Sequence, residues 1–288
     1  MILPQADRSI LENAFLGLLV PSGTAALILV LTTRLGRERS TRTLGSPLAL
    51  GLSFAAGYAV TQGWPPLPPE IGIKQWLFYA GLFGGLYGAY EALSERRSLV
   101  TRMVIAVAAP LLFLQFMREH HWTTVASVLW TAGLAAALFL TWQALETLAE
   151  RRGGFPLPLA LGITSALAGE ALHFSGSTTL GQLAGALATA LVACAVLGFL
   201  RPDSRLAPGG LAPFVLLHSG LVWGGRFASE LTFPGFALLT VAPLLAWTGE
   251  LVPPARSRWR LALTLLLPAL AASVAVLLER GATAEPYG

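Results

Sequence analysis

Hydrophobic residues gather in ten long runs along the chain, and short polar loops separate these runs. A helix needs about 20 apolar residues to cross the roughly 30 Å hydrocarbon core of a bilayer. The pattern therefore predicts an all-α fold: a polytopic transmembrane bundle of about ten helices with short loops, forming a single integral membrane domain over residues 1–288. We place the spans at residues 11–33, 46–63, 74–94, 99–117, 123–148, 156–174, 180–200, 211–226, 235–251 and 261–278.

The composition agrees with this class. Charged residues make up 12% of the chain and hydrophobic residues 55%, whereas soluble domains carry roughly 25% charged residues. A soluble core could not bury so much apolar surface in a chain of 288 residues. The net charge of +4 does not indicate nucleic acid, because the basic residues stand in loops between apolar runs. We expect the lipid bilayer as the surroundings and no nucleic acid as a partner.

The loops alternate between arginine-rich and arginine-poor, and this alternation predicts the orientation in the membrane. Of the 19 Lys and Arg residues, 14 fall on one side and five on the other. Positively charged loops resist translocation, so the richer side should be cytoplasmic and both termini extracytoplasmic. A bacterial cytoplasmic membrane, that is, an inner membrane, is the expected location. The 14 residues are Arg34, Arg37, Arg39, Arg42, Arg96, Arg97, Arg102, Arg151, Arg152, Arg201, Arg205, Arg256, Arg258 and Arg260.

Tryptophans also lie near the ends of the predicted spans. Trp64 and Trp223 fall near outer ends, and Trp142 falls near an inner end. Tryptophan is enriched at both interfaces of a bilayer. We therefore expect these side chains to form interfacial belts.

Ionisable residues inside spans are costly and are therefore functional candidates. Glu170 and His173 are three residues apart in the sixth span, a spacing that puts both on one helical face. His218 lies about halfway along the eighth span, and Arg226 lies near its outer end. These four residues are our candidates for a substrate or proton pathway. The alternatives are a neutral His218 that is hydrogen-bonded across helices and an Arg226 that pairs with Glu230.

Motifs of catalysis and metal binding are sparse. The chain has no Gly-x-Ser-x-Gly, no His-Glu-x-x-His and no P-loop, and no aspartate lies in any predicted span. A metal site can be drawn from Glu170 and His173 together with Glu119, His120 and His121 of the preceding outer loop, but loop histidines beside a cation are more often solvated. We name no catalytic residue, no metal ligand and no cofactor, and an enzyme is the less favoured class.

A row of glycines predicts close packing of the third span. Gly81, Gly84, Gly85 and Gly88 put small residues along one face of the third span, which predicts close contact with a neighbouring helix.

The segments 91–97 and 146–152 resemble each other at an offset of 55 residues. The resemblance indicates either an internal repeat, as in many transporters, or the basic residues that a helix C-terminus favours.

Three hypotheses about function follow. The first choice is a small-solute secondary transporter, which would use the candidate residues in the spans. A non-catalytic subunit or scaffold of a larger membrane complex would explain the absence of motifs, with other membrane proteins or further copies of this chain as partners. A membrane enzyme acting on a lipid-linked substrate is third, because it would need outer Glu and His residues as acid and base.

Overall fold

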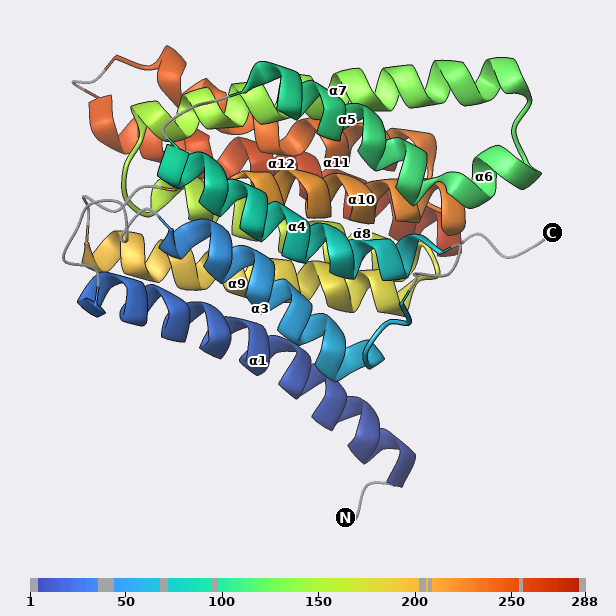
Figure 1. Cartoon of the computed structure of the whole chain (residues 1–288), viewed down its shortest axis with the longest axis horizontal. Helices are drawn as coiled ribbons and strands as arrows, with labels where there is room; N and C mark the ends of the chain where they lie inside the picture. The colour runs from blue at the N-terminus through green and yellow to red at the C-terminus, as the bar shows by residue number, and fades with distance from the viewer. Residues whose placement is uncertain are drawn as a thin grey trace.

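The computed structural model describes residues 5–35, 44–67, 72–94, 98–201, 206, 209–253 and 256–284, and among these residues it shows helices and no strand. The helices lie side by side in one bundle (Figure 1). They are α1 (Gln5–Leu35), α3 (Gly45–Gln62), α4 (Ile73–Ser94), α5 (Leu99–Phe113), α6 (Gln115–His120), α7 (Thr124–Arg151), α8 (Pro156–Phe174), α9 (Thr178–Leu200), α10 (Ala212–Ala228), α11 (Phe233–Val241), the 3-10 helix η1 (Ala242–Leu251) and α12 (Ser257–Ala284).

Each of the ten predicted runs coincides with a helical segment. The fourth run is divided into α5 and α6 at Leu114, and the ninth comprises α11 followed directly by η1. Six segments of the described chain are long and apolar enough to cross a membrane. A helical membrane bundle is therefore supported, whereas a count of ten spans goes beyond this finding. The six are 16–34, 124–151, 156–174, 178–200, 233–251 and 257–283.

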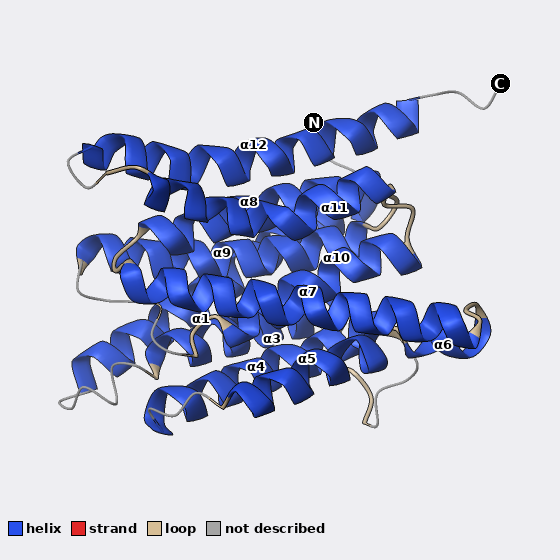
Figure 2. Cartoon of the chain, turned by 90° about the horizontal axis from the view of Figure 1, so that it is seen from above, coloured by secondary structure: helices blue, strands red, loops and turns tan. Residues whose placement is uncertain are grey.

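Successive long helices run in opposite directions, so the connections alternate between two ends of the bundle (Figures 1 and 2). We call the end where α4, α7 and α9 finish the basic end, because the arginine-rich loops follow these helices. We call the other end, where α3, α8 and α10 finish, the opposite end. The described parts of α1 and α12 begin and finish, respectively, at this opposite end (Figure 1).

Several helices begin with a capping side chain. The hydroxyl groups of Ser98, Thr123, Ser177 and Thr232 each accept a hydrogen bond from a backbone N–H three residues later. Such a cap satisfies one of the amide donors that the first turn of a helix leaves unpaired. The caps explain locally why α5, α7, α9 and α11 begin where they do.

Glycines allow the helices to approach closely, as the sequence predicts. A methyl group added at Gly84 would lie 2.8 Å from the Cα of Pro213 in α10. One added at Gly169 of α8 would lie 2.9 Å from the carbonyl oxygen of Gly181 in α9. Both distances are too short for a real methyl contact, so larger residues would separate these pairs of helices.

The prediction of interfacial tryptophans is wrong for Trp142 and Trp223, and it stays a prediction for Trp64. Trp64 is exposed at the opposite end, as an interfacial residue should be. Trp142 and Trp223 are buried inside the bundle, where their rings pack edge to face against Tyr87 and Phe113. Their positions near span ends did not reveal that neighbouring helices cover them.

Candidate functional site

His218 lies in α10, the helix that the other helices surround most completely. Its side chain is 4% exposed, and its ring stacks on Phe214 with the two ring centroids 5.2 Å apart. Nε2 of His218 lies 3.1 Å from the carbonyl oxygen of Leu239 in α11. A carbonyl oxygen only accepts, so Nε2 carries the proton and donates it.

Pro243 explains why the carbonyl oxygen of Leu239 is available to accept a hydrogen bond from His218. The α-helical part of the α11–η1 segment ends at Val241, and the 3-10 part begins at Ala242, immediately before Pro243. Proline has no N–H, so in a continuous helix the carbonyl four residues earlier would lose its donor. That carbonyl belongs to Leu239. His218 replaces the missing donor, which agrees with the alternative of a neutral histidine bonded across helices.

Glu170 and His173 share one face of α8, as their spacing predicts, but this face points away from the bundle. Both side chains are exposed, whereas His218 is buried. Arg226 is partly buried at the end of α10, and its Nη1 donates to the carbonyl oxygen of Leu231, 3.0 Å away. The structure therefore does not gather the four candidates around one space.

Sequence reasoning missed a buried charged cluster at the basic end. Arg102, in the first turn of α5, is 1% exposed. Its Nε and Nη2 donate to the two carboxylate oxygens of Glu91 in α4, each at 2.8 Å. Its Nη2 also lies 3.7 Å from Oε1 of Glu146 in α7. We counted Arg102 among the cytoplasmic loop residues, and its burial corrects that assignment.

Further groups extend this cluster, which we call the Arg102 cluster. Tyr87 donates its hydroxyl proton to Oε1 of Glu91 at 2.9 Å. The backbone N–H of Gly209, before α10, donates to Oε1 of Glu146 at 2.8 Å. The Arg102 guanidinium lies over the Trp142 ring, 5.4 Å from its centroid. The cluster thus joins α4, α5, α7 and the segment before α10 through charge-assisted hydrogen bonds and the ion pair of Arg102 with Glu146.

The sequence carried one signal of this cluster. Glu91 and Glu146 occupy equivalent positions in the two similar segments 91–97 and 146–152. In the structure both carboxylates face the same arginine. The similarity therefore coincides with a shared ion-pairing role.

A second charged group lies near the basic end of α7, η1 and α12. Glu250 accepts from Nε of Arg152 and from Nη2 of Arg260, the latter at 2.7 Å. Arg152 also donates to the hydroxyl of Thr264 in α12. Two arginines on one carboxylate hold three segments together, and the arrangement contains no nucleophile beside a base.

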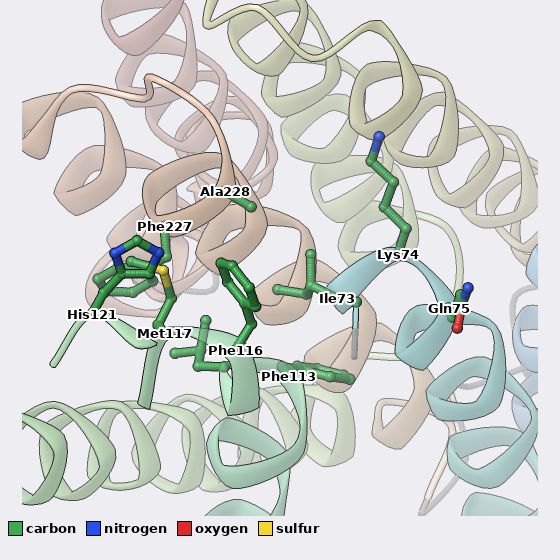
Figure 3. A pocket seen from close by; sticks show the side chains of 11 residues that line it. Ile73, Lys74, Gln75, Phe113, Phe116, Met117, His121, Phe227 and Ala228 are labelled. Carbon is green, nitrogen blue, oxygen red and sulfur yellow. The ribbon is translucent and has the colours of Figure 1, made fainter. Parts of the chain in front are cut away.

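The opposite end holds a cavity of about 620 Å³ (Figure 3). It lies between the start of α4, the α5–α6 junction, the residue after α6 and the end of α10. None of the four candidate residues lines it. Its walls are formed by Gly72, Ile73, Lys74, Gln75, Phe113, Leu114, Phe116, Met117, His121, Phe227 and Ala228.

The histidine-rich loop beside this cavity has other partners. Glu119 accepts a hydrogen bond from Gln115 at 2.8 Å, and Nδ1 of His120 lies 3.1 Å from the carbonyl oxygen of Phe116. Within the described part of the chain, no group of three or more His, Cys, Asp or Glu side chains is arranged to hold a metal ion.

The chain matches no protein family model, no curated protein and no solved structure. Its function must therefore be argued from its own residues.

Proposed function

We propose that this chain is a ten-span membrane protein whose basic end faces the cytoplasm, and that it serves as a non-catalytic subunit of a larger membrane complex. Six segments meet the length and hydropathy of a lipid-facing span. The other helices are shorter or richer in small residues. α10, with 17 residues, is about 26 Å long, close to the roughly 30 Å hydrocarbon core. Because protein covers most of α10, it does not need a lipid-facing surface.

The observation that carries the subunit proposal is a projecting apolar hairpin. α6 and the first turns of α7 extend past the ends of the neighbouring helices in both views (Figures 1 and 2). α7 has 28 residues and is about 42 Å long, well beyond the thickness of the hydrocarbon core. Its projecting part exposes Val125, Val128 and Leu129. In the arrangement that we propose, this part of α7 stands beyond the hydrocarbon core, where exposed apolar side chains need a protein surface to cover them.

This hairpin is fixed to the bundle close to its turn. Trp122 and Trp130 stack with centroids 6.2 Å apart, and each packs edge to face on Phe227 of α10 at 5.2 Å. Rigid aromatic contacts of this kind hold a surface in one orientation. The hairpin therefore presents its apolar side chains as a preformed surface that a helix of another membrane protein can cover.

Site-specific photocrosslinking in native membranes tests the proposal. Val128 and Leu140 lie on the same helix and are both 64% exposed, so Leu140 is a matched lipid-facing control. A photoreactive residue at position 128 should give a discrete protein adduct, either with a partner or with a second copy of this chain. The same residue at position 140 should give lipid adducts. Equal patterns at the two positions would contradict the proposal.

Secondary transport of a small solute is the second candidate, and one observation favours it. The α11–η1 segment changes from α-helix to 3-10 helix beside His218, and discontinuous helices often form transporter sites. In this proposal His218 is the inner group and Arg226 lies nearer the opposite end, while Glu170 and His173 exchange protons at the exposed surface of α8. Proteoliposomes should then show proton flux that His218→Ala and Glu170→Gln abolish. Flux that survives both changes would exclude the relay.

A further inference from the structure

The cavity at the opposite end separates apolar from polar groups. Figure 3 shows the side chains of Phe113, Phe116, Met117 and Phe227 gathered around a common space. Lys74 and His121 stand at its edges, and the Lys74 amine extends away from the apolar side chains (Figure 3). A cavity of about 620 Å³ lies within the roughly 300–1,000 Å³ range of small-molecule sites. Its apolar walls suit a hydrocarbon chain.

Among the described residues that line this cavity, the charged side chain is Lys74. Lys74 is the only lysine of the chain, and it is exposed at the first turn of α4. No aspartate or glutamate is among the described lining residues. The carboxylate of Glu119 is hydrogen-bonded to Gln115. An exposed ammonium group at the mouth of an apolar cavity favours a ligand that is negatively charged at one end.

The position of the cavity fits a ligand that enters from the membrane. The α5–α6 break at Leu114 moves Phe116 out of the line of α5, and this ring remains about half exposed. It stacks on His120 with the ring centroids 4.7 Å apart. The cavity is thus open beside an aromatic ring at the end of the bundle, which in the ten-span arrangement that we propose is the level of the lipid headgroups.

We propose that this cavity binds an anionic amphiphile, with one acyl chain against Phe113, Phe116 and Phe227 and the negatively charged head at Lys74. A lysine has a flexible four-carbon stem, so its ammonium group can follow a head at the cavity mouth. Anionic phospholipids and free fatty acids share this chemistry. The cavity shares α6 with the projecting hairpin, but binding of an amphiphile there needs no partner protein, so the subunit proposal can fail without affecting it.

Native mass spectrometry of the full chain in a mild detergent tests this proposal. The probes are phosphatidylglycerol, phosphatidylcholine with the same acyl chains, and palmitate. We expect one phosphatidylglycerol to bind in preference to phosphatidylcholine. Lys74→Gln should weaken this binding about fivefold, the effect of one cation near an anionic head. Arg280→Gln removes an exposed cation of α12 that does not line the cavity, and it should change nothing.

A second pair of variants tests the apolar part. Ala228 lines the cavity and is exposed, so Ala228→Trp should fill it and abolish binding. Val196→Trp adds the same ring at an exposed position of α9 outside the cavity and should leave binding intact. Palmitate binding that depends on Lys74, without phosphatidylglycerol binding, would assign the site to free fatty acids. Equal binding of both phospholipids, or binding unaffected by Lys74→Gln and Ala228→Trp, would overturn the proposal.

Discussion

His218 donates a hydrogen bond from Nε2 to the carbonyl oxygen of Leu239, 3.1 Å away, and so replaces the helical donor that Pro243 lacks. The bond joins α10 to α11 at the point where the helix changes its geometry. It explains why a polar residue lies in the middle of an apolar bundle. The effects of substitutions at Pro243 and His218 on the free energy of unfolding should therefore depend on each other.

His218→Leu should lower the free energy of unfolding by about 1–3 kcal/mol, because it leaves a buried carbonyl without a donor. Pro243→Ala restores a backbone N–H that can bond Leu239. In the Pro243→Ala background, His218→Leu should therefore lower the free energy of unfolding by a clearly smaller amount. A double-mutant cycle on thermal unfolding in detergent measures this coupling. Additive effects of the two changes would show that the proline does not explain the histidine.

Arg102→Met should lower the free energy of unfolding by about 3–5 kcal/mol, since it leaves buried carboxylates without their cation. Arg102→Lys keeps the charge but cannot form the two parallel hydrogen bonds to Glu91, so it should be only partly tolerated. Arg201, exposed at the same end, provides the control. Arg201→Met should stay within about 0.5 kcal/mol of the wild type. Equal effects of Arg102→Met and Arg201→Met in unfolding experiments would contradict a structural role for the Arg102 cluster.

Gly169→Ala should separate α8 from α9, because the added methyl group would lie 2.9 Å from the carbonyl oxygen of Gly181. Overpacking of this kind costs about 1–3 kcal/mol. Gly133 of α7 has open space where a methyl group would stand. Gly133→Ala should therefore be neutral or stabilising by up to about 1 kcal/mol through helix propensity. The unfolding temperature of Gly169→Ala should fall, whereas that of Gly133→Ala should stay the same or rise. A fall of equal size in both variants would contradict the close packing of α8 on α9.

The sequence predicted the positions of the helices well, because runs of apolar residues are a local signal. It also predicted the glycine contacts of α4, since a row of small residues has little other use in a membrane helix. It did not predict which face of α8 points outward. The remaining residues of α8 are mostly apolar on every face. The sequence therefore did not show whether the face that carries Glu170 and His173 points toward the bundle or away from it.

Local sequence patterns could not reveal contacts between residues that lie far apart in the chain. Arg102 stands beside arginine-rich loops, and nothing in its spacing shows that Glu91 and Glu146 converge on it across three helices. Trp142 illustrates the same difficulty, because a tryptophan near a span end is equally compatible with the interface and with a buried contact. The cavity at the opposite end arises from a helix break and three separate segments, none of which carries a ligand motif.

The side of the membrane on which each loop lies tests the ten-span proposal most directly. Reporter fusions after Arg39, Arg97, Arg152, Arg205 and Arg258 should report cytoplasm, and fusions after Pro68, His120, Ser177, Ser229 and Ala284 should report the opposite side. The pair Arg97 and Arg152 is decisive, because α5 and α7 lie between them. If both helices cross, as we propose, the two fusions report the same side. If only the six candidate spans cross, α7 alone separates them and they report opposite sides, which would contradict the ten-span account.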